Sequence, residues 1–165
     1  MNKLRQEEFI LEHEKWLQQA IDMAITNVKD GGGPFAAIIV KDGKVIGSGT
    51  NRVHINHDPS AHAELLAIRE ACATLETINL SDCILYASGE PCPMCLGAAY
   101  WSSVGHIYYA CSKTDAKLHA GFPNPLNSFF SDQQKKPTER YIPFTHYNTE
   151  NALHPFEEWN ERKKV

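Results

Sequence analysis

A chain of 165 residues with 42% hydrophobic content is long enough to bury one sizeable core, so we expect a single domain over 1–165. Its 16 Lys and Arg residues against 20 Asp and Glu residues give a formal net charge of −4, which disfavours a nucleic-acid partner because no basic field attracts a polyanion. Residues 1–16 carry many charges and no apolar run suited to a signal peptide or a membrane span, so we expect a cytoplasmic protein.

The first element predicted is a long amphipathic helix. Apolar side chains recur at steps of three and four residues over 6–28, which is typical of such a helix. The glycine triplet 31–33 predicts its end. A phosphate-cradling role for the triplet is disfavoured, because Pro34 and a strand follow where a helix would be needed.

The middle of the chain alternates between strands and helices. We expect strands over 35–40 and 45–51, a polar loop over 52–58, a helix over 59–76, a strand over 83–88, a helix over 94–101 and a strand over 106–111. The turn signal Asp42-Gly43 predicts a hairpin of the first two strands. The last strand–helix–strand run predicts a right-handed crossover and parallel pairing, with helices on both faces of the sheet.

After residue 111 the pattern weakens. We expect a short helix over 113–120, a turn-rich loop over 121–125, a polar linker over 131–140, a strand over 141–147 and a last helix over 155–164. This tail has few residues for a core of its own, so we expect it to dock on another surface.

Two short stretches carry the chemistry, His62-Ala63-Glu64 and Pro91–Cys95. They offer one imidazole, two thiols and one carboxylate. Zinc takes four protein ligands in a structural site, but three protein ligands and water in a catalytic one. We therefore predict an open zinc site held by His62, Cys92 and Cys95, with Glu64 as a proton carrier beside it.

The spacing of these residues sets a condition on the helices. Residues two apart on a helix point about 200° apart, so His62 and Glu64 can share a site only at a helix tip. An N-cap at Asp58 or Ser60 supplies such a tip, and Pro93 starts a second helix at the thiol pair. Two helix N-termini facing one metal favour thiolates.

Two other readings of the motifs stay open. A C-x-x-C pair at a helix start is also typical of thioredoxin-type redox proteins, although the upstream H-x-E favours zinc. A structural zinc module would need a fourth ligand, for which His54, His57 and His106 are the candidates, and would leave Glu64 dispensable. The other thiols, Cys72, Cys83 and Cys111, are expected to be reduced core residues.

H-x-E with P-C-x-x-C is the motif of zinc deaminases, in which the metal activates water and the glutamate shuttles protons. Over nearly its whole length the chain resembles the small bacterial guanine deaminases of the cytidine deaminase superfamily. The resemblance is carried by 32–35, Asn51, 58–64, 83–86, 90–97, 100–101, 114–116, 120–122 and 142–144.

This resemblance implies an α/β fold, a three-layer αβα sandwich around a mixed five-stranded sheet. It implies a zinc-dependent amidine hydrolase of purine metabolism that converts guanine to xanthine and ammonia, with one Zn²⁺ per subunit. It further implies a homodimer in which the C-terminal segment 123–165 is exchanged between subunits over the active site. Asn51 is expected to hydrogen-bond the base, and Phe35 and Trp101 to line the pocket.

The chain departs from this family near the pocket. Related guanine deaminases carry acidic residues after the A-G-F stretch, one of which contacts the purine and assists proton transfer, whereas Pro123 and Asn124 stand here. Asn124 can hydrogen-bond the base but cannot exchange a proton at neutral pH. Asp115 is the alternative for that part, or else a structural residue of its turn. Gly89 also replaces a larger residue.

Because of these departures, other substrates stay open. The related possibilities are cytosine, isocytosine, an aminotriazine or a guanine nucleoside. Adenosine in tRNA fits the P-C-P-M-C box equally well, but the sequence pI of about 6.0 disfavours it.

Overall fold

The structure is a computed structural model that describes residues 3–121 and 126–162, with the backbone alone for 3–9 and 126–128. The chain divides into two compact units, Met1–Asn124 and Pro125–Val165. Within the described residues, no helix combines the length and the apolar character needed to cross a membrane.

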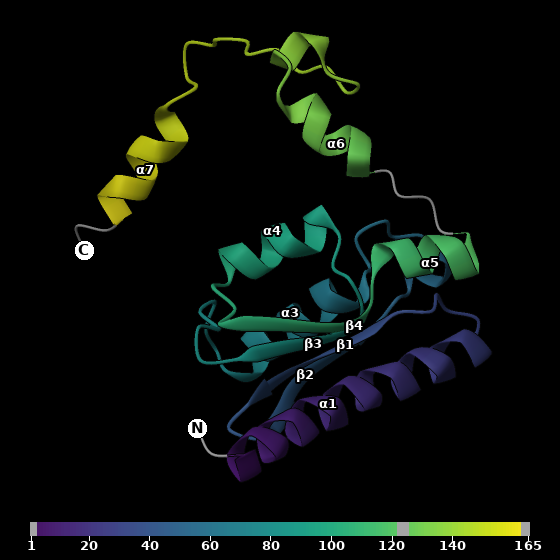
Figure 1. Cartoon of the computed structure of the whole chain (residues 1–165). Coiled ribbons are helices and arrows are strands. Elements are labelled where there is room, and N and C mark those ends of the chain that lie inside the picture. The colour runs from purple at the N-terminus through teal and green to yellow at the C-terminus, as the bar shows by residue number, and fades with distance from the viewer. Residues whose placement is uncertain (1–2, 122–125, 163–165) are drawn as a thin grey trace. The chain divides into compact units, whose positions relative to one another are not determined.

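In the first unit, strands and helices follow one another in the predicted order (Figure 1). They are α1 (Lys3–Lys29), β1 (Ala36–Lys41), β2 (Lys44–Thr50), α2 (Val53–Asn56), α3 (Ala63–Thr74), β3 (Ile84–Gly89), α4 (Pro93–Trp101), β4 (His106–Cys111) and α5 (Lys113–Ala120). The long first helix, the hairpin, the strand–helix–strand run and the short helix over 113–120 are confirmed. The predicted loop over 52–58 contains the short helix α2.

The strands form one mixed sheet in the order β2-β1-β3-β4. β1 pairs antiparallel with β2 and β3, whereas β3 pairs parallel with β4, as the crossover predicts. At the hairpin turn Asp42 and Gly43 both have positive φ, 49° and 70°, which is the conformation that the Asp-Gly signal favours. The described residues form four strands, one fewer than predicted.

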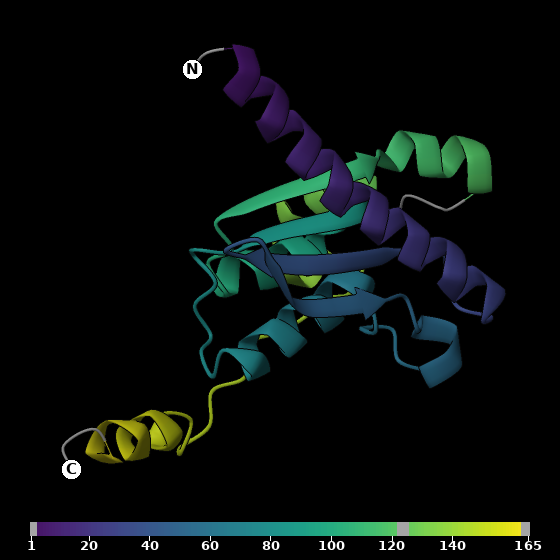
Figure 2. The ribbon, with the colours of Figure 1, turned by 90° about the horizontal axis from the view of Figure 1, so that it is seen from below.

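Helices cover both faces of this sheet, which confirms the predicted three layers (Figures 1 and 2). On one face Trp16 of α1 packs in a buried cluster with Ile38 and Tyr86. On the other face, Ala67 of α3 and Ala99 of α4 belong to a second buried cluster. The helices α3 and α4, which begin at the predicted zinc ligands, therefore lie on the same side of the sheet.

A histidine lies among aromatic rings at the α1 face. The His13 Nδ1 atom is 2.7 Å from the Tyr86 hydroxyl oxygen, and the imidazole stacks on Tyr108 with ring centroids 4.1 Å apart. Burial lowers the pKa of His13; the charge of Glu12 opposes this shift, and the charge of His106 adds to it. The folded protein therefore favours the neutral imidazole.

This lowered pKa predicts a pH dependence of stability. The unfolded histidine has a pKa of about 6.5 and binds a proton more tightly than the folded one. His13 therefore stabilises the fold above that pH, and this contribution is lost as the pH falls from about 6.5 through the lower pKa of the folded state. Between about pH 7.5 and about pH 5.5, we expect the Tm of the zinc-loaded protein to fall more than that of its His13→Phe variant. Equal falls would show that His13 carries none of the dependence.

The second unit holds two helices, α6 (Leu126–Gln133) and α7 (His154–Arg162), and the short 3₁₀ helix η1 (Pro137–Glu139). The last helix is confirmed. The predicted linker over 131–140 is wrong, because Asp132 accepts a hydrogen bond from the Tyr141 backbone N–H at 2.9 Å and pairs with Lys135 at 2.9 Å, which folds this stretch on itself. The predicted strand over 141–147 is also wrong, since these residues form no strand.

Candidate metal centre

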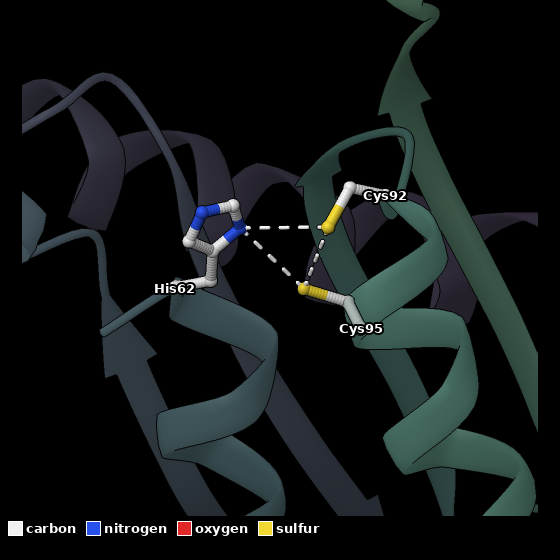
Figure 3. A group of neighbouring side chains, drawn as sticks. All are labelled: His62, Cys92 and Cys95. Carbon is white, nitrogen blue, oxygen red and sulfur yellow. Dashed lines mark hydrogen bonds between the residues drawn. The ribbon is translucent and has the colours of Figure 1, made fainter. Parts of the chain in front are cut away.

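Three side chains converge at the tips of two helices (Figure 3). His62 precedes the first turn of α3, Cys92 precedes the first turn of α4, and Cys95 lies within that turn. The His62 Nδ1 atom is 3.6 Å from each sulfur, and the two sulfurs are 3.5 Å apart. The structure thus brings all three predicted metal ligands together.

These separations fit one tetrahedral zinc ion. With Zn–S bonds of about 2.3 Å and a Zn–N bond of about 2.0–2.1 Å, the sulfurs would lie about 3.8 Å apart and the nitrogen about 3.5 Å from each. Among the residues that the structure describes, no fourth His, Cys, Asp or Glu completes the group, so His54, His57 and His106 are not part of it. Two cysteines and one histidine form a ligand set of catalytic zinc sites.

The tip of α3 begins four residues later than predicted. The helix starts at Ala63 and its N-cap is His62, so the predicted cap at Asp58 or Ser60 is wrong. Asp58 Oδ1 instead accepts hydrogen bonds from the backbone N–H and the hydroxyl of Ser60, both at 2.7 Å, and closes a turn before the helix. Because the His62 backbone is extended (φ −75°, ψ 149°), its side chain avoids the helical spacing that would separate it from Glu64.

The tip of α4 forms as predicted. Pro93 occupies the start of the helix and Cys92 is the N-cap, with an extended backbone (φ −75°, ψ 166°). The Leu96 N–H donates to the Cys92 carbonyl oxygen at 2.8 Å, which closes the first turn around Cys95. Both thiols therefore lie at the positive end of the helix dipole, where thiolates are favoured.

Hydrogen bonds among the three ligands shift their protonation. The bond between the two sulfurs, followed by the bond with His62, lowers the pKa of Cys92 to about 4, and the bond with Cys92 raises the pKa of Cys95. The bond with Cys92 also raises the pKa of His62. The arrangement thus favours the thiolate at Cys92, and metal binding releases the remaining protons.

Glu64 lies in the first turn of α3, directly beside these ligands. Its side chain is only 7% exposed, so it is not an ordinary solvent-facing carboxylate of a helix start. Burial raises the pKa of Glu64, and hydrogen bonds with the Glu64 backbone and with Cys95 partly offset this shift. A buried carboxyl group with a raised pKa holds a proton more readily than a solvent-facing one, which suits a group that accepts a proton and returns it.

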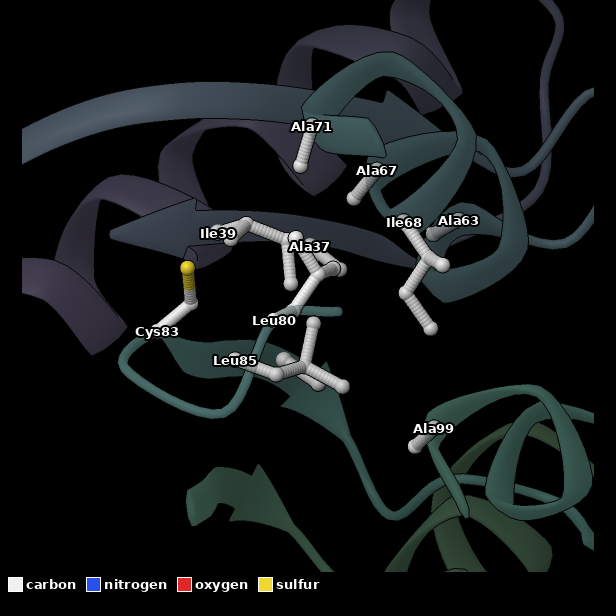
Figure 4. Packing of buried hydrophobic residues seen from close by; sticks show 11 residues of the cluster. Ala37, Ile39, Ala63, Ala67, Ile68, Ala71, Leu80, Cys83, Leu85 and Ala99 are labelled. Atoms are coloured by element: carbon white, nitrogen blue, oxygen red, sulfur yellow. The ribbon is translucent and has the colours of Figure 1, made fainter. Parts of the chain in front are cut away.

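Ala63, Ala67 and Ala71 form an alanine face of α3 that packs on the sheet (Figure 4). This packing fixes the position of the helix and of Glu64 in its first turn. Gly47 and Gly49 of β2 lie under this face. A Cβ atom on Gly47 would come 2.6 Å from the Ala71 backbone nitrogen, and one on Gly49 would come 2.8 Å from that of Ala67. Only glycine lets the strand and the helix approach this closely.

Substituting Gly49 should therefore destabilise the protein. In Gly49→Ala the new methyl group meets backbone atoms of α3, so we expect a loss of about 1–3 kcal/mol in the free energy of unfolding, measured by chemical denaturation. Gly97→Ala is the matched control, because nothing lies within 4 Å of a Cβ there and alanine stabilises a helix by about 0.5–1 kcal/mol. Equal stabilities of the two variants would disprove the close packing.

Two predicted pocket residues lie on the loops that lead into and out of the hairpin. Asn51 follows β2, and its side-chain oxygen accepts a hydrogen bond from the Val53 N–H at 3.3 Å. Phe35 precedes β1 and packs against the core that contains α3. A Cβ on Gly89 would lie 2.9 Å from the Phe35 ring, so the small residue at position 89 makes room for that ring.

The other predicted substrate contacts have different settings. Trp101 ends α4 and is 89% exposed. Asp115 forms a capping box at the start of α5, where it accepts hydrogen bonds from the Ser112 hydroxyl at 2.6 Å and the Ser112 N–H at 3.2 Å. Asn124 lies outside the described residues.

Sequence reasoning missed one polar residue near these loops. Asn27 is 4% exposed and donates to backbone carbonyls of both loops that flank the hairpin. An asparagine at a core-facing step of the amphipathic pattern over 6–28 was the available signal. Its two carbonyl partners, Gly33 and Asn51, could not be inferred from that pattern.

Comparisons with known proteins agree with this site. The zinc-binding region of cytidine and deoxycytidylate deaminases matches residues 11–111. Guanine deaminase of Bacillus subtilis is 48% identical over 151 residues, which span 90% of this chain and 94% of that protein. The X-ray structure of a Bacillus subtilis guanine deaminase matches with a TM-score of 0.83 at 46% identity, covering 90% of this chain and 94% of that chain. A tRNA-specific adenosine deaminase of Aquifex aeolicus is 40% identical over 114 residues, 69% of this chain and 74% of that protein.

The matched family region contains His62, Cys92 and Cys95 at zinc-binding distances from one another, and Glu64 beside them. The rival redox interpretation of the thiol pair gives no reason for the imidazole to lie 3.6 Å from both sulfurs. The chain belongs to the cytidine and deoxycytidylate deaminase zinc-binding family and is a zinc-dependent hydrolytic deaminase.

Proposed function

We propose that the substrate is guanine, which the protein hydrolyses to xanthine and ammonia. The observation that carries this proposal is the similarity to a guanine deaminase over 94% of that protein's length. The Aquifex aeolicus relative favours tRNA adenosine as a second candidate. The net charge of −4 weighs against it, because binding to tRNA gains from neutralising phosphates with Lys and Arg.

Glu64 is the proposed catalytic residue. Zinc held by His62, Cys92 and Cys95 supplies, when bound, a Lewis acid that makes water nucleophilic near neutral pH. The Glu64 carboxylate accepts a proton from the water molecule and delivers it to a ring nitrogen beside the carbon under attack. It then carries the second proton to the amino group, which leaves as ammonia, while the carbon keeps the oxygen. One water and one guanine thus give one xanthine and one ammonia.

Asn51, Phe35 and Trp101 are the proposed pocket residues. The Val53 N–H donates to the Asn51 side-chain oxygen, which orients the amide so that its N–H donors can reach a carbonyl or a ring nitrogen of the base. A further side chain is proposed to contact the purine. Because the Asp115 carboxylate is already bonded to Ser112 in the capping box, we propose Asn124 for this contact. Asn124 is an amide where related enzymes have an acidic residue, and Asp115 is acidic but lies before the A-G-F stretch instead of after it.

We further propose a cytoplasmic homodimer in which the C-terminal segment 123–165 docks on a second copy. Its apolar side chains are exposed: Phe129, Phe130, Tyr141, Ile142, Phe144, Tyr147, Leu153, Phe156 and Trp159. The first unit also exposes Tyr100, Trp101, Tyr109 and Leu118. Apolar surface of this extent is typical of a protein interface. Sedimentation at micromolar concentration should give a dimer, and a monomer would exclude the exchange.

A substrate panel tests the proposed function. The zinc-loaded protein would be incubated with guanine, guanosine, cytosine, isocytosine, an aminotriazine and tRNA, and the release of ammonia followed. We expect the highest kcat/KM for guanine, by about 100-fold or more, because buried polar groups reject a base that cannot pair with them. Turnover of another compound without turnover of guanine would overturn the assignment.

A further inference from the structure

Asn27 lies in the last turn of α1 and joins two loops of the first unit. Its Nδ2 atom donates to the carbonyl oxygens of Gly33, at 2.8 Å, and Asn51, at 2.9 Å. Its Oδ1 atom accepts a hydrogen bond from the Arg52 guanidinium at 3.3 Å, which fixes the orientation of the amide. Both polar atoms of the buried Asn27 amide therefore have hydrogen-bond partners.

The bonds continue from Asn51 toward the metal centre. The peptide group between Asn51 and Arg52 takes part in two hydrogen bonds. Its carbonyl oxygen accepts the bond from Asn27, and its N–H, which belongs to Arg52, donates to the Ala61 carbonyl oxygen at 2.9 Å. Ala61 directly precedes His62. Asn27 thus lies at one end of a hydrogen-bonded path that links the Asn51 backbone to the residue before a metal ligand.

The glycines of the 31–33 loop match this arrangement. A Cβ on Gly32 would come 2.5 Å from the side-chain carbon and oxygen of the Asn27 amide, and one on Gly33 would come 2.8 Å from the Asn51 side-chain oxygen. The Gly33 N–H also donates to the Asn51 carbonyl oxygen at 3.1 Å. Two of the three glycines therefore leave space for the two asparagines.

We propose that Asn27 is a positioning residue for substrate binding, which sets the Asn51 amide relative to the metal centre by holding the Asn51–Arg52 peptide. This inference rests on the base contact proposed for Asn51. Asn27 does not touch the base. Because α3 is anchored on β2 through its own alanine face, loss of the Asn27 amide leaves the metal ligands in place.

A double-mutant cycle on Asn27 and Asn51 tests this inference. The wild type, Asn27→Ala, Asn51→Ala and the double variant would be compared by the Kd for hypoxanthine, a purine with no amino group to lose, and by the KM and kcat for guanine. We expect Asn27→Ala to raise Kd and KM about tenfold, the effect of one lost hydrogen bond to a buried partner, with kcat within about threefold. In the Asn51→Ala background the same change should alter Kd by less than about twofold.

Three results would overturn the inference: an unchanged Kd in Asn27→Ala, an equal rise in Kd in both backgrounds, or a loss confined to kcat.

Asn79→Ala is the matched control, because the Asn79 side chain also bonds a loop backbone: it accepts a hydrogen bond from the Ser81 N–H at 2.9 Å in an exposed loop. If Asn27→Ala does not fold, Asn27→Ser, which keeps one hydrogen-bond donor, replaces it in the double-mutant cycle. A wild type that turns over no base refutes the proposed function, whereas an active wild type with an additive cycle refutes only this inference.

Discussion

Replacing Glu64 with glutamine is expected to lower kcat by about two to four orders of magnitude while the protein keeps one zinc ion per chain. Glutamine matches the size of the buried glutamate but cannot exchange protons at neutral pH. Because the metal ligands are His62, Cys92 and Cys95, this change removes proton transfer and leaves the ligand set intact. Steady-state kinetics with guanine and zinc analysis of the same sample measure both quantities.

Glu70→Gln is the matched control for this prediction. Glu70 lies on the same helix, but its carboxylate accepts hydrogen bonds from the Ser48 backbone N–H at 2.5 Å and the Ser48 hydroxyl at 3.0 Å. We expect this variant to keep the wild-type kcat. A Glu64→Gln enzyme with a kcat within about tenfold of wild type would contradict the role of Glu64 as the proton carrier.

Removing the Cys95 thiol is expected to abolish both zinc binding and activity. Cys95 is fully buried, and in Cys95→Ala the described residues offer only His62 and Cys92 to hold the ion. Because a ligand that binds only the folded state stabilises it by about 4 kcal/mol at a thousand times its Kd, added zinc should raise the Tm of the wild type and not that of the variant. Zinc analysis and thermal unfolding with and without a chelator measure the two effects.

Cys72→Ala separates the metal effect from the general effect of losing a thiol. Cys72 lies on α3 but packs against the core cluster, away from the three ligands. We expect this variant to keep one zinc ion and its activity. If Cys95→Ala also bound zinc stoichiometrically, the ligand set derived from the geometry would be wrong.

The metal centre could be predicted from the sequence because the chemistry depends on few residue types at short spacing. His62, Cys92 and Cys95 converge as expected, and the condition that His62 and Glu64 meet at a helix tip is fulfilled. The start of that helix was misplaced for a local reason. Asp58 can cap a helix or close a turn with Ser60, and the sequence signals for the two are nearly the same.

The second unit was the least predictable part. The sequence predicts a strand over 141–147, but a strand forms only with a partner, and the described residues form none there. The stretch over 131–140 was expected to be a linker because it is polar. Its polar groups instead bond to one another, as Asp132 does with Lys135 and Tyr141. Such pairings depend on the folded path of the chain.

The fate of solvent oxygen tests hydrolytic deamination most directly. The zinc-loaded protein would be incubated with guanine in ¹⁸O-labelled water, and the products analysed by mass spectrometry and an ammonia assay. Hydrolytic deamination predicts xanthine with one solvent-derived ¹⁸O atom, formed in equal amount to ammonia, in the wild type and at a greatly reduced rate in Glu64→Gln. Intact guanine, or xanthine without the label, would contradict it.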